Sequence, residues 1–169
     1  MRDRQASRDA RRAREFEAFV AGAAGRLLHA ATLLTAETGD DNPRAQKLLT
    51  ASLAKTYASW DRLRGEDPYD CARKDLAVRF AHGTWPRLHR RRRAGGVGGG
   101  VGVLGQLSPQ ERLILVLRLF EGVGEEQVAA LLGLPMERVR AVHTRAMGLV
   151  LHPPRGPAPA PPLRKAAST

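Results

Sequence analysis

The sequence predicts an all-α protein made of two small helical domains that a glycine-rich linker joins. Apolar residues recur at three- and four-residue spacing from Phe16 to Leu34 and again within residues 125–151, which is the pattern of helices with one buried face. Between these stretches, residues 94–106 are dominated by glycine and offer little side-chain surface for a core. We therefore expect a helical domain over residues 14–93, a flexible linker over 94–106, a second helical domain over 107–151 and a disordered, proline-rich tail over 152–169.

The first domain is expected to be a three-helix bundle. Its first helix should end near Leu34, because Gly39 to Asn42 are turn-forming residues. A second helix should run from about Arg44 to Trp60. Its core-facing residues are expected to be Leu48, Leu49, Leu53, Tyr57 and Trp60.

A third helix should begin at Pro68, which suits a first helical turn, and reach His82. The dipeptide Trp85-Pro86 should end it, because proline disfavours a helical conformation in the residue before it. Five arginines then crowd into residues 87–93 with no acid among them. An aromatic residue beside such a cluster suits stacking on bases together with contacts to phosphates. A solvated run of charge is the alternative interpretation.

The second domain opens with a strong helix-start signal at Ser108-Pro109-Gln110-Glu111. This segment is a capping box, in which the serine and glutamate side chains satisfy backbone N–H groups reciprocally, with proline at the first helical position. Apolar residues follow at helical spacing as far as Phe120, and Gly122 should end the helix. We expect this helix to pack behind the two helices that come after it.

Residues 125–151 predict a helix-turn-helix. The short first helix has one apolar stripe, and Gly133 follows it where glycine most easily adopts the left-handed conformation. Pro135 suits the first turn of the second helix. One side of that helix carries Val139, Val142 and Ala146. Its arginines lie elsewhere, so this helix is the natural reader of a DNA major groove, while an ordinary helical hairpin is the alternative.

The charge of the chain indicates a polyanionic partner. Its 169 residues carry a formal net charge of +11, with a pI near 11.2, which fits DNA, RNA or an acidic protein surface. Cys71 is the only cysteine, which excludes an internal disulfide and a thiolate zinc cluster. No apolar run approaches the roughly 18 residues that cross a bilayer, so we expect a cytoplasmic protein without membrane insertion.

Enzyme functions fit this sequence poorly. Its five histidines show no metal-ligand spacing, and no pair of residues suits acid–base or nucleophilic chemistry. We therefore expect no catalytic residue, no metal and no cofactor.

The motifs resemble those of bacterial RNA polymerase sigma factors of the extracytoplasmic-function (ECF) group. The similarity is greatest from Leu107 to Gly122, through the segments LSPQER and VLRLFEG, and it continues over residues 126–133. In the first domain it is fainter and rests on Leu53, Lys55, Tyr57, Trp60, Asp61, Pro68 and Trp85. The resemblance implies that the second domain binds the minus-thirty-five promoter element and the first domain the minus-ten element.

The resemblance also assigns roles to individual residues. The residues implied to face the upstream element are Arg138, Arg140, Thr144 and Arg145. Those implied to lie near the downstream element are Arg79, His82, Thr84, Trp85, Arg87, Arg90 and Arg91. Arginine forks can read guanine edges, and the remaining polar groups can hold phosphates.

Docking on core RNA polymerase is implied for the second helix, at Lys47, Leu48, Thr50 and Ala51. Family members usually carry acids in this segment. Because Lys47 and Ala51 replace them, we expect weaker binding to core polymerase. In the recognition helix, Pro135 stands where a serine or threonine N-cap is usual, and Val142 where an arginine often contacts phosphate.

The expected function is that of a sigma factor, with promoter DNA, core RNA polymerase and an anti-sigma factor as partners. Two alternatives stay open. One is a helix-turn-helix transcriptional regulator that does not dock on polymerase. The other is a degenerate sigma factor that acts as an interaction protein.

Overall fold

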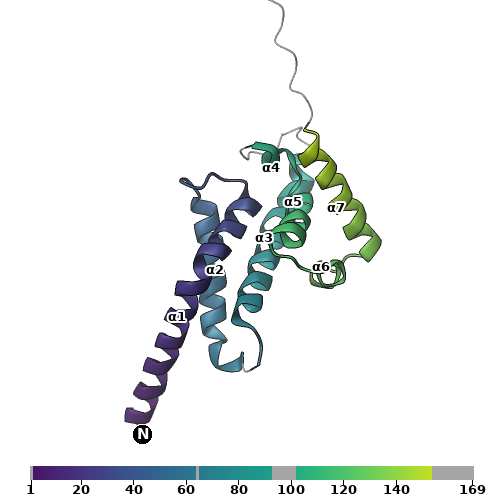
Figure 1. The fold of residues 1–169 in the computed structure, drawn as a ribbon. Coiled ribbons are helices and arrows are strands. Elements are labelled where there is room, and N and C mark those ends of the chain that lie inside the picture. Colours follow the sequence, from purple (N-terminus) through teal and green to yellow (C-terminus); the bar gives the residue numbers. More distant parts are fainter. Residues whose placement is uncertain (1, 64, 93–101, 154–169) are drawn as a thin grey trace, which may run out of the picture.

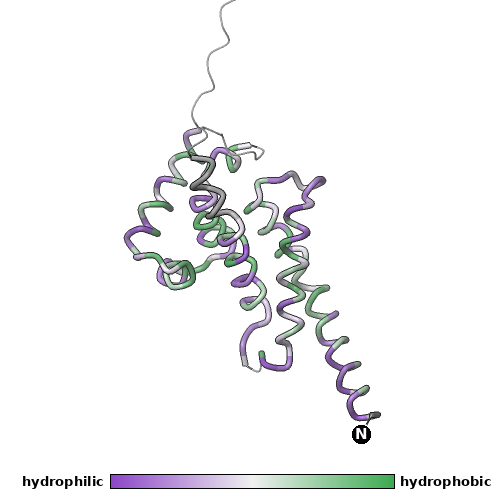
Figure 2. Tube along the Cα trace, turned by 180° about the vertical axis from the view of Figure 1, so that it is seen from behind, coloured by the Kyte–Doolittle hydropathy of each residue, from purple (hydrophilic) through white to green (hydrophobic). Residues whose placement is uncertain are grey.

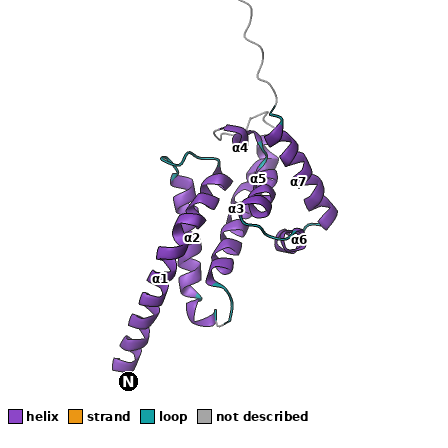
Figure 3. Ribbon diagram, in the orientation of Figure 1, coloured by secondary structure: helices purple, strands orange, loops and turns teal. Residues whose placement is uncertain are grey.

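The computed structural model describes residues 2–63, 65–92 and 102–153, with the backbone alone at residues 2, 3 and 84–92. These ranges are helical and contain no strand, which confirms the predicted all-α class (Figure 1, Figure 3). The N-terminal elements are α1 (Arg2–Thr35), α2 (Pro43–Ala58), the 3₁₀ turn η1 (Trp60–Arg62) and α3 (Pro68–Arg92). The C-terminal elements are α4 (Gly102–Gln106), α5 (Pro109–Leu115), the π-helical segment η2 (Val116–Phe120), α6 (Glu125–Leu132) and α7 (Met136–Leu151).

Helix α1 is longer than predicted and projects beyond the bundle at its N-terminal end (Figure 1). That end is hydrophilic (Figure 2), because residues 2–14 contain six arginines and the described side chains from Arg4 to Ala10 are exposed. The later part of α1 packs on α2 and α3 through its apolar face. The helix therefore has a solvated arm and a buried half.

The buried line of α2 differs from the predicted one. Its buried residues are Ala45, Ser52 and Thr56. The leucines at 48, 49 and 53 are only half-buried, and Tyr57 is 37% exposed. Small side chains on this line let α2 approach its neighbours closely, and the Thr56 hydroxyl is satisfied by the Ser52 carbonyl at 3.0 Å. The prediction is therefore partly wrong, because Leu48, Leu49 and Leu53 pack against the core while half-buried, whereas Tyr57 is exposed.

Helix α3 continues through Pro86 to Arg92, so the predicted stop at Trp85-Pro86 is wrong. Proline removes one backbone hydrogen bond and disfavours helix in the preceding residue, but it does not forbid a helix from continuing. The run of arginines that begins at Arg87 is consequently part of a helix up to Arg92.

One hydrophobic core joins the two halves of the chain. It is formed by residues of α1, α3, α5, α6 and α7, including Ala31, Leu34, Leu76, Phe80, Leu113, Ile114, Val128 and Val139. A smaller cluster of Leu107, Leu115 and Ala146 lies beneath α4, and Leu104 packs against it. The helices predicted as two separate domains therefore pack directly against each other.

The predicted flexible linker is partly wrong. Its residues 94–101 lie outside the described residues, but residues 102–106 form α4, with Gly105 buried. The helix forms because Leu104 finds an apolar partner surface that the sequence pattern does not reveal. Of the predicted tail, only His152 and Pro153 are described, and neither is helical.

One helix among the described residues is long and apolar enough to cross a membrane. It spans Arg4–Thr35, contains an apolar window with a mean hydropathy of 1.3, and has 33% of that window buried inside the protein. Arg26 interrupts this window, so it is not an uninterrupted apolar run. The same stretch supplies Ala30, Ala31 and Leu34 to the core, which is the ordinary behaviour of a core helix.

Candidate nucleic-acid interface

The helix-turn-helix predicted for residues 125–151 is present as α6 and α7. Gly133 ends α6 in the left-handed conformation, with φ of 63°, and the Leu134 N–H donates to the Ala129 carbonyl at 3.0 Å. Pro135 lies in an extended conformation immediately before α7, and its carbonyl accepts from the Val139 N–H at 3.2 Å. Ala129 is only 7% exposed, so its small side chain lies in the packed angle between the helices.

Helix α7 has one buried side and one open side. Val139, Val142 and Ala146 are buried, as the sequence predicts. The four residues predicted to face DNA are all exposed: Arg138, Arg140, Thr144 and Arg145. Val142 is 7% exposed and belongs to the core, so at this position α7 has no side chain available for a phosphate.

The centre of the open side is formed by Thr144, which the sequence predicts to face DNA, together with residues that the sequence did not single out. Glu137, Ala141, Thr144 and Gly148 are exposed and follow helical spacing along one line. Arginines flank this line, with Arg140 on one side and Arg138 and Arg145 on the other. The small side chains of Ala141, Thr144 and Gly148 in the middle, with cations at the edges, suit close approach to base edges between two phosphate backbones.

Two of these arginines are already ion-paired. Arg140 Nη2 lies 2.8 Å from Glu125 Oε1, and Arg145 Nε lies 3.0 Å from Glu111 Oε1. The arginine side chains keep 61% and 74% of their surface exposed, whereas the two carboxylates are mostly covered. Each arginine is therefore paired with one acid while most of its side chain stays open to solvent. Sequence spacing could not reveal these pairs, because they join α7 to α6 and to α5.

His143 is a titratable residue on the covered side of α7. His143 is half-buried, and its Nε2 is shielded from solvent with no hydrogen-bond partner among the described residues. Burial lowers the pKa of His143, the nearby Arg118 lowers it further, and Glu125 opposes them. A neutral imidazole therefore belongs to the folded state of the helix-turn-helix.

The candidate downstream-element residues lie along α3. Arg79 and His82 are exposed, and Arg79 pairs with Asp75 one helical turn earlier. Thr84, Trp85, Arg87, Arg90 and Arg91 lie on the helical backbone, and their side chains are outside the described part of the chain. The α3 backbone thus places all seven residues along one continuous helix.

The candidate polymerase-docking residues on α2 differ in accessibility. Lys47 and Thr50 are exposed, and Ala51 is half-buried. Leu48 packs against the main core, so its side chain is committed to folding. The surface available for docking is therefore carried chiefly by Lys47 and Thr50.

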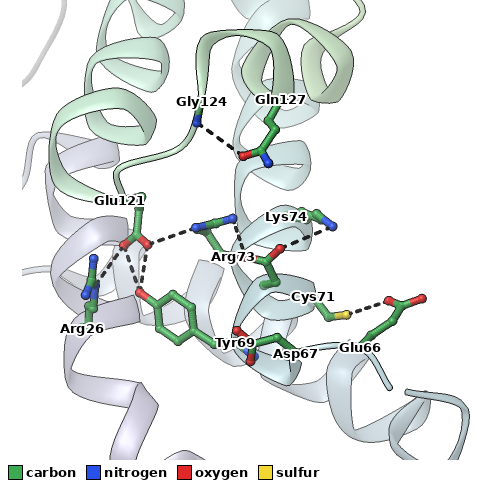
Figure 4. Close-up of polar contacts among 11 residues, drawn as sticks. Arg26, Glu66, Asp67, Tyr69, Cys71, Arg73, Lys74, Glu121, Gly124 and Gln127 are labelled. Carbon is green, nitrogen blue, oxygen red and sulfur yellow. Dashed lines mark hydrogen bonds and ion pairs between the residues drawn. The ribbon is translucent and has the colours of Figure 1, made fainter. Parts of the chain in front are cut away.

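Glu121 forms a polar contact between the two halves of the chain (Figure 4), and the sequence assigned it no role. Its side chain is 1% exposed and accepts from the Tyr69 hydroxyl of α3 at 3.0 Å. Its oxygens also lie 3.7 Å from Arg26 Nε of α1 and 3.9 Å from Arg73 Nη1 of α3. The π-helical segment η2 and Gly122, with φ of 67°, turn the chain here, which brings Glu121 to the bundle.

This contact changes the chemistry of Tyr69. Burial, the hydrogen bond to Glu121 and the charge of that carboxylate raise the pKa of Tyr69 to about 12. The hydroxyl is thereby held protonated as a donor. Arg26 also donates to the Phe120 carbonyl at 3.1 Å, so α1 contacts the same turn twice.

Comparison with known proteins agrees with this geometry. Residues 103–149 match the family model of sigma-70 region 4. The chain is also similar to the co-crystal structure of the sigma factor RpoE in complex with the anti-sigma factor NepR from Bartonella quintana. That likeness has a TM-score of 0.60 and 19% sequence identity, and it covers 83% of this chain and 99% of that chain. None of the curated proteins matches.

The two matches support different parts of the molecule. The family match covers the helix-turn-helix with α5 and η2, as the sequence resemblance indicated. The structural match covers both halves. Because its sequence identity is low, it shows a shared fold and nothing more specific. The C-terminal sequence thus matches sigma-70 region 4, and the whole chain shares the fold of the RpoE structure.

Proposed function

We propose that this chain is a sigma factor of the ECF group, which binds core RNA polymerase and directs it to promoters. The observation that carries the proposal is the arginine-flanked open side of α7, within a segment that matches sigma-70 region 4. In this role α7 lies in the major groove of the minus-thirty-five element. Arg140 and Arg145 contact phosphates or guanine edges from the two sides of the helix.

The minus-ten element is assigned to α3. Arg79 and His82 are exposed on this helix, and the arginine-rich residues that follow them continue it. Cations and an aromatic residue on one helix suit single-stranded bases and their phosphates. The protein acts as a subunit that positions polymerase, and the chemistry of transcription belongs to the polymerase.

An anti-sigma factor is a further proposed partner. The similar RpoE structure is a complex with the anti-sigma factor NepR, and that likeness covers both halves of this chain. A protein that binds both halves would control access to promoter DNA and to polymerase together.

The proposal is tested with purified full-length protein, core polymerase and a pool of random DNA duplexes. We expect the protein to enrich one DNA sequence class and to support transcript synthesis by core polymerase from the enriched sequences. The matched control carries Arg140→Ala and Arg145→Ala, which should abolish the enrichment while the circular dichroism spectrum stays unchanged. Transcripts from core polymerase that do not depend on the added protein would contradict the proposal.

A regulator that does not dock on polymerase is the second candidate, because α2 carries Lys47 and Ala51 where sigma factors of this group usually carry acids. Sequence-selective DNA binding without any co-purification of core polymerase would favour this candidate. An interaction protein that binds an anti-sigma factor would show neither DNA selectivity nor polymerase binding.

A further inference from the structure

The N-terminal arm of α1, residues 2–14, is rich in cations. It contains six arginines and two acids, Asp3 and Asp9. Every side chain from Arg4 to Ala10 is exposed, and the arm projects beyond the bundle (Figure 1) as a hydrophilic segment (Figure 2). Alanine is the one apolar residue type in the arm, so no large apolar side chain is available on it. A partner of the arm must therefore recognise charge.

Three of these arginines share one face of the arm. Arg4, Arg8 and Arg11 follow four- and three-residue spacing, which places their side chains one above another on a helix. Arg4 and Arg8 form no ion pair with any acid whose side chain is described. Arg11 Nε lies 3.5 Å from Glu15 Oε1, yet 71% of the Arg11 side chain stays exposed. This face is therefore a row of three accessible cations.

The row of cations destabilises the helix that carries it. Arg4 and Arg8 are four residues apart, and like charges at this spacing repel each other. Arg4 also lies in the first turn of α1, where the helix dipole favours an anion. Asp9, the acid between Arg8 and Arg11, accepts from Gln5 Nε2 at 3.1 Å. An anion bound along the row would offset both unfavourable effects.

The base of the arm is held firmly on the bundle. The Arg12 guanidinium lies over the Tyr57 ring, 4.3 Å from its centroid, donates to the Tyr57 carbonyl and pairs with Asp61 of η1 at 3.3 Å. The Phe16 ring packs against Tyr57 and Trp60, with centroids 4.8 and 5.2 Å apart. These contacts fix the direction in which the arm leaves the bundle. They hold the row of cations in one place, which a tail that only confers solubility would not need.

We propose that the arm binds the phosphate backbone of duplex DNA through Arg4, Arg8 and Arg11. The three arginines span about 10 Å of helix axis, and the same length of duplex carries about six phosphate charges. Phosphate contacts need no apolar anchor, whereas protein interfaces usually rely on buried aromatic anchors and membrane-bound helices on an apolar face. The choice of DNA rests on the proposed function, while the contact itself does not involve α7.

The first test measures the affinity of the full-length protein for a labelled duplex of random sequence against salt concentration. We expect Arg4→Gln with Arg8→Gln to lower the slope of log affinity against log salt by about 2, one unit for each lost phosphate contact. The matched control, Arg44→Gln with Lys55→Gln, removes two exposed cations of α2 and should leave the slope unchanged. An unchanged slope in the arm variant, or an equal reduction in both variants, would overturn the proposal.

The second test measures backbone hydrogen exchange in residues 4–14 of the full-length protein, alone and with the random duplex, polyglutamate or vesicles of anionic lipid. The duplex should slow exchange in the arm, both in the wild type and in Arg140→Ala with Arg145→Ala, because the contact does not depend on α7. Slower exchange with polyglutamate or vesicles but not with the duplex would assign the arm to an acidic protein or a membrane surface and overturn the proposal. If the wild type shows neither sequence preference nor transcription with core polymerase, the proposed function fails, while both tests still decide the DNA contact of the arm.

Discussion

The Tyr69 hydroxyl lies 3.0 Å from both carboxylate oxygens of Glu121, and 52 residues of chain separate the two. This contact joins α3 to the turn that precedes the helix-turn-helix. It places a buried charge and its donors at the boundary between the two halves of the molecule. The contribution of this contact to stability can be measured by changing the pH and by substituting its residues.

Alkaline pH should weaken the contact between Tyr69 and Glu121. The pKa of Tyr69 is raised to about 12 from an ordinary value of 10, so the folded state disfavours the tyrosinate. The contribution of the protonated Tyr69 hydroxyl to the free energy of unfolding is complete below pH 10. It is lost as the pH rises from about 10 to about 12. We expect tyrosinate absorbance in a Tyr57→Phe background, which leaves Tyr69 as the single tyrosine, to have its midpoint near the upper value. A midpoint at the ordinary value of a free tyrosine would contradict the contact.

Removing the charge of Glu121 should destabilise the protein. Glu121→Gln leaves the covered Arg73 with Asp70 as its one remaining acid and weakens the bond from Tyr69. Hydrogen bonds to buried charged groups are typically worth about 2 kcal/mol, which sets the expected loss in the free energy of unfolding measured in urea. Glu126→Gln, on an exposed acid of α6, is the control and should change stability little. Similar values for the two variants would show that the contact does not stabilise the fold.

The ion pairs of α7 should limit DNA affinity. Arg140→Ala and Arg145→Ala should each weaken DNA binding. The loss of a phosphate contact should lower the slope of log affinity against log salt concentration by about 1, and the loss of a base contact should cost roughly 1–3 kcal/mol of binding free energy. Glu125→Gln should act in the opposite direction, because it frees Arg140 and removes a negative charge beside the DNA. Fluorescence anisotropy with labelled duplexes measures all three variants. Weaker binding by Glu125→Gln would mean that this acid positions Arg140 rather than competing with DNA.

Acidic pH should loosen the helix-turn-helix. The pKa of His143 lies below its ordinary value of 6.5 because of burial and of Arg118. The neutral form is therefore favoured in the folded state, and the stabilisation present above pH 6.5 is lost as the pH falls through the folded pKa. We expect His143→Gln to reduce the loss of stability between neutral and mildly acidic pH. His152→Gln, at an exposed position beyond α7, is the control and should not change that loss.

Acids on α2 should strengthen the binding of core polymerase. Lys47 and Thr50 are exposed and Ala51 is half-buried, so Lys47→Asp with Ala51→Glu changes this surface without removing a buried side chain. Complementary charges act mainly on encounter and partner choice, so the gain should be largest at low salt. A salt-varied titration against core polymerase measures it, with circular dichroism as the folding control. Equal affinities for the two proteins would exclude this face of α2 from docking.

The sequence by itself determined the parts of the molecule that depend on local chemistry. The capping box predicted at Ser108 is present, with the Glu111 N–H donating to Ser108 Oγ at 3.3 Å and the Ser108 N–H to Glu111 Oε2 at 2.8 Å. Gly133 takes the left-handed conformation that the turn requires. Helical periodicity also placed the buried side of α7, and with it the exposure of Arg140. These features could be predicted because each depends on residues within a few positions of one another.

Only the tertiary structure decided which distant groups meet. No periodicity pairs Glu121 with Tyr69, or Arg140 with Glu125, because the two residues of each pair lie in different elements of the fold. The helical conformation of α3 through Pro86 and of α4 beside Leu107 also contradicts local preference. The physical reason is that local helix propensities contribute less free energy than burial in a shared core does. The order of residues along the chain does not predict which surfaces will be buried together.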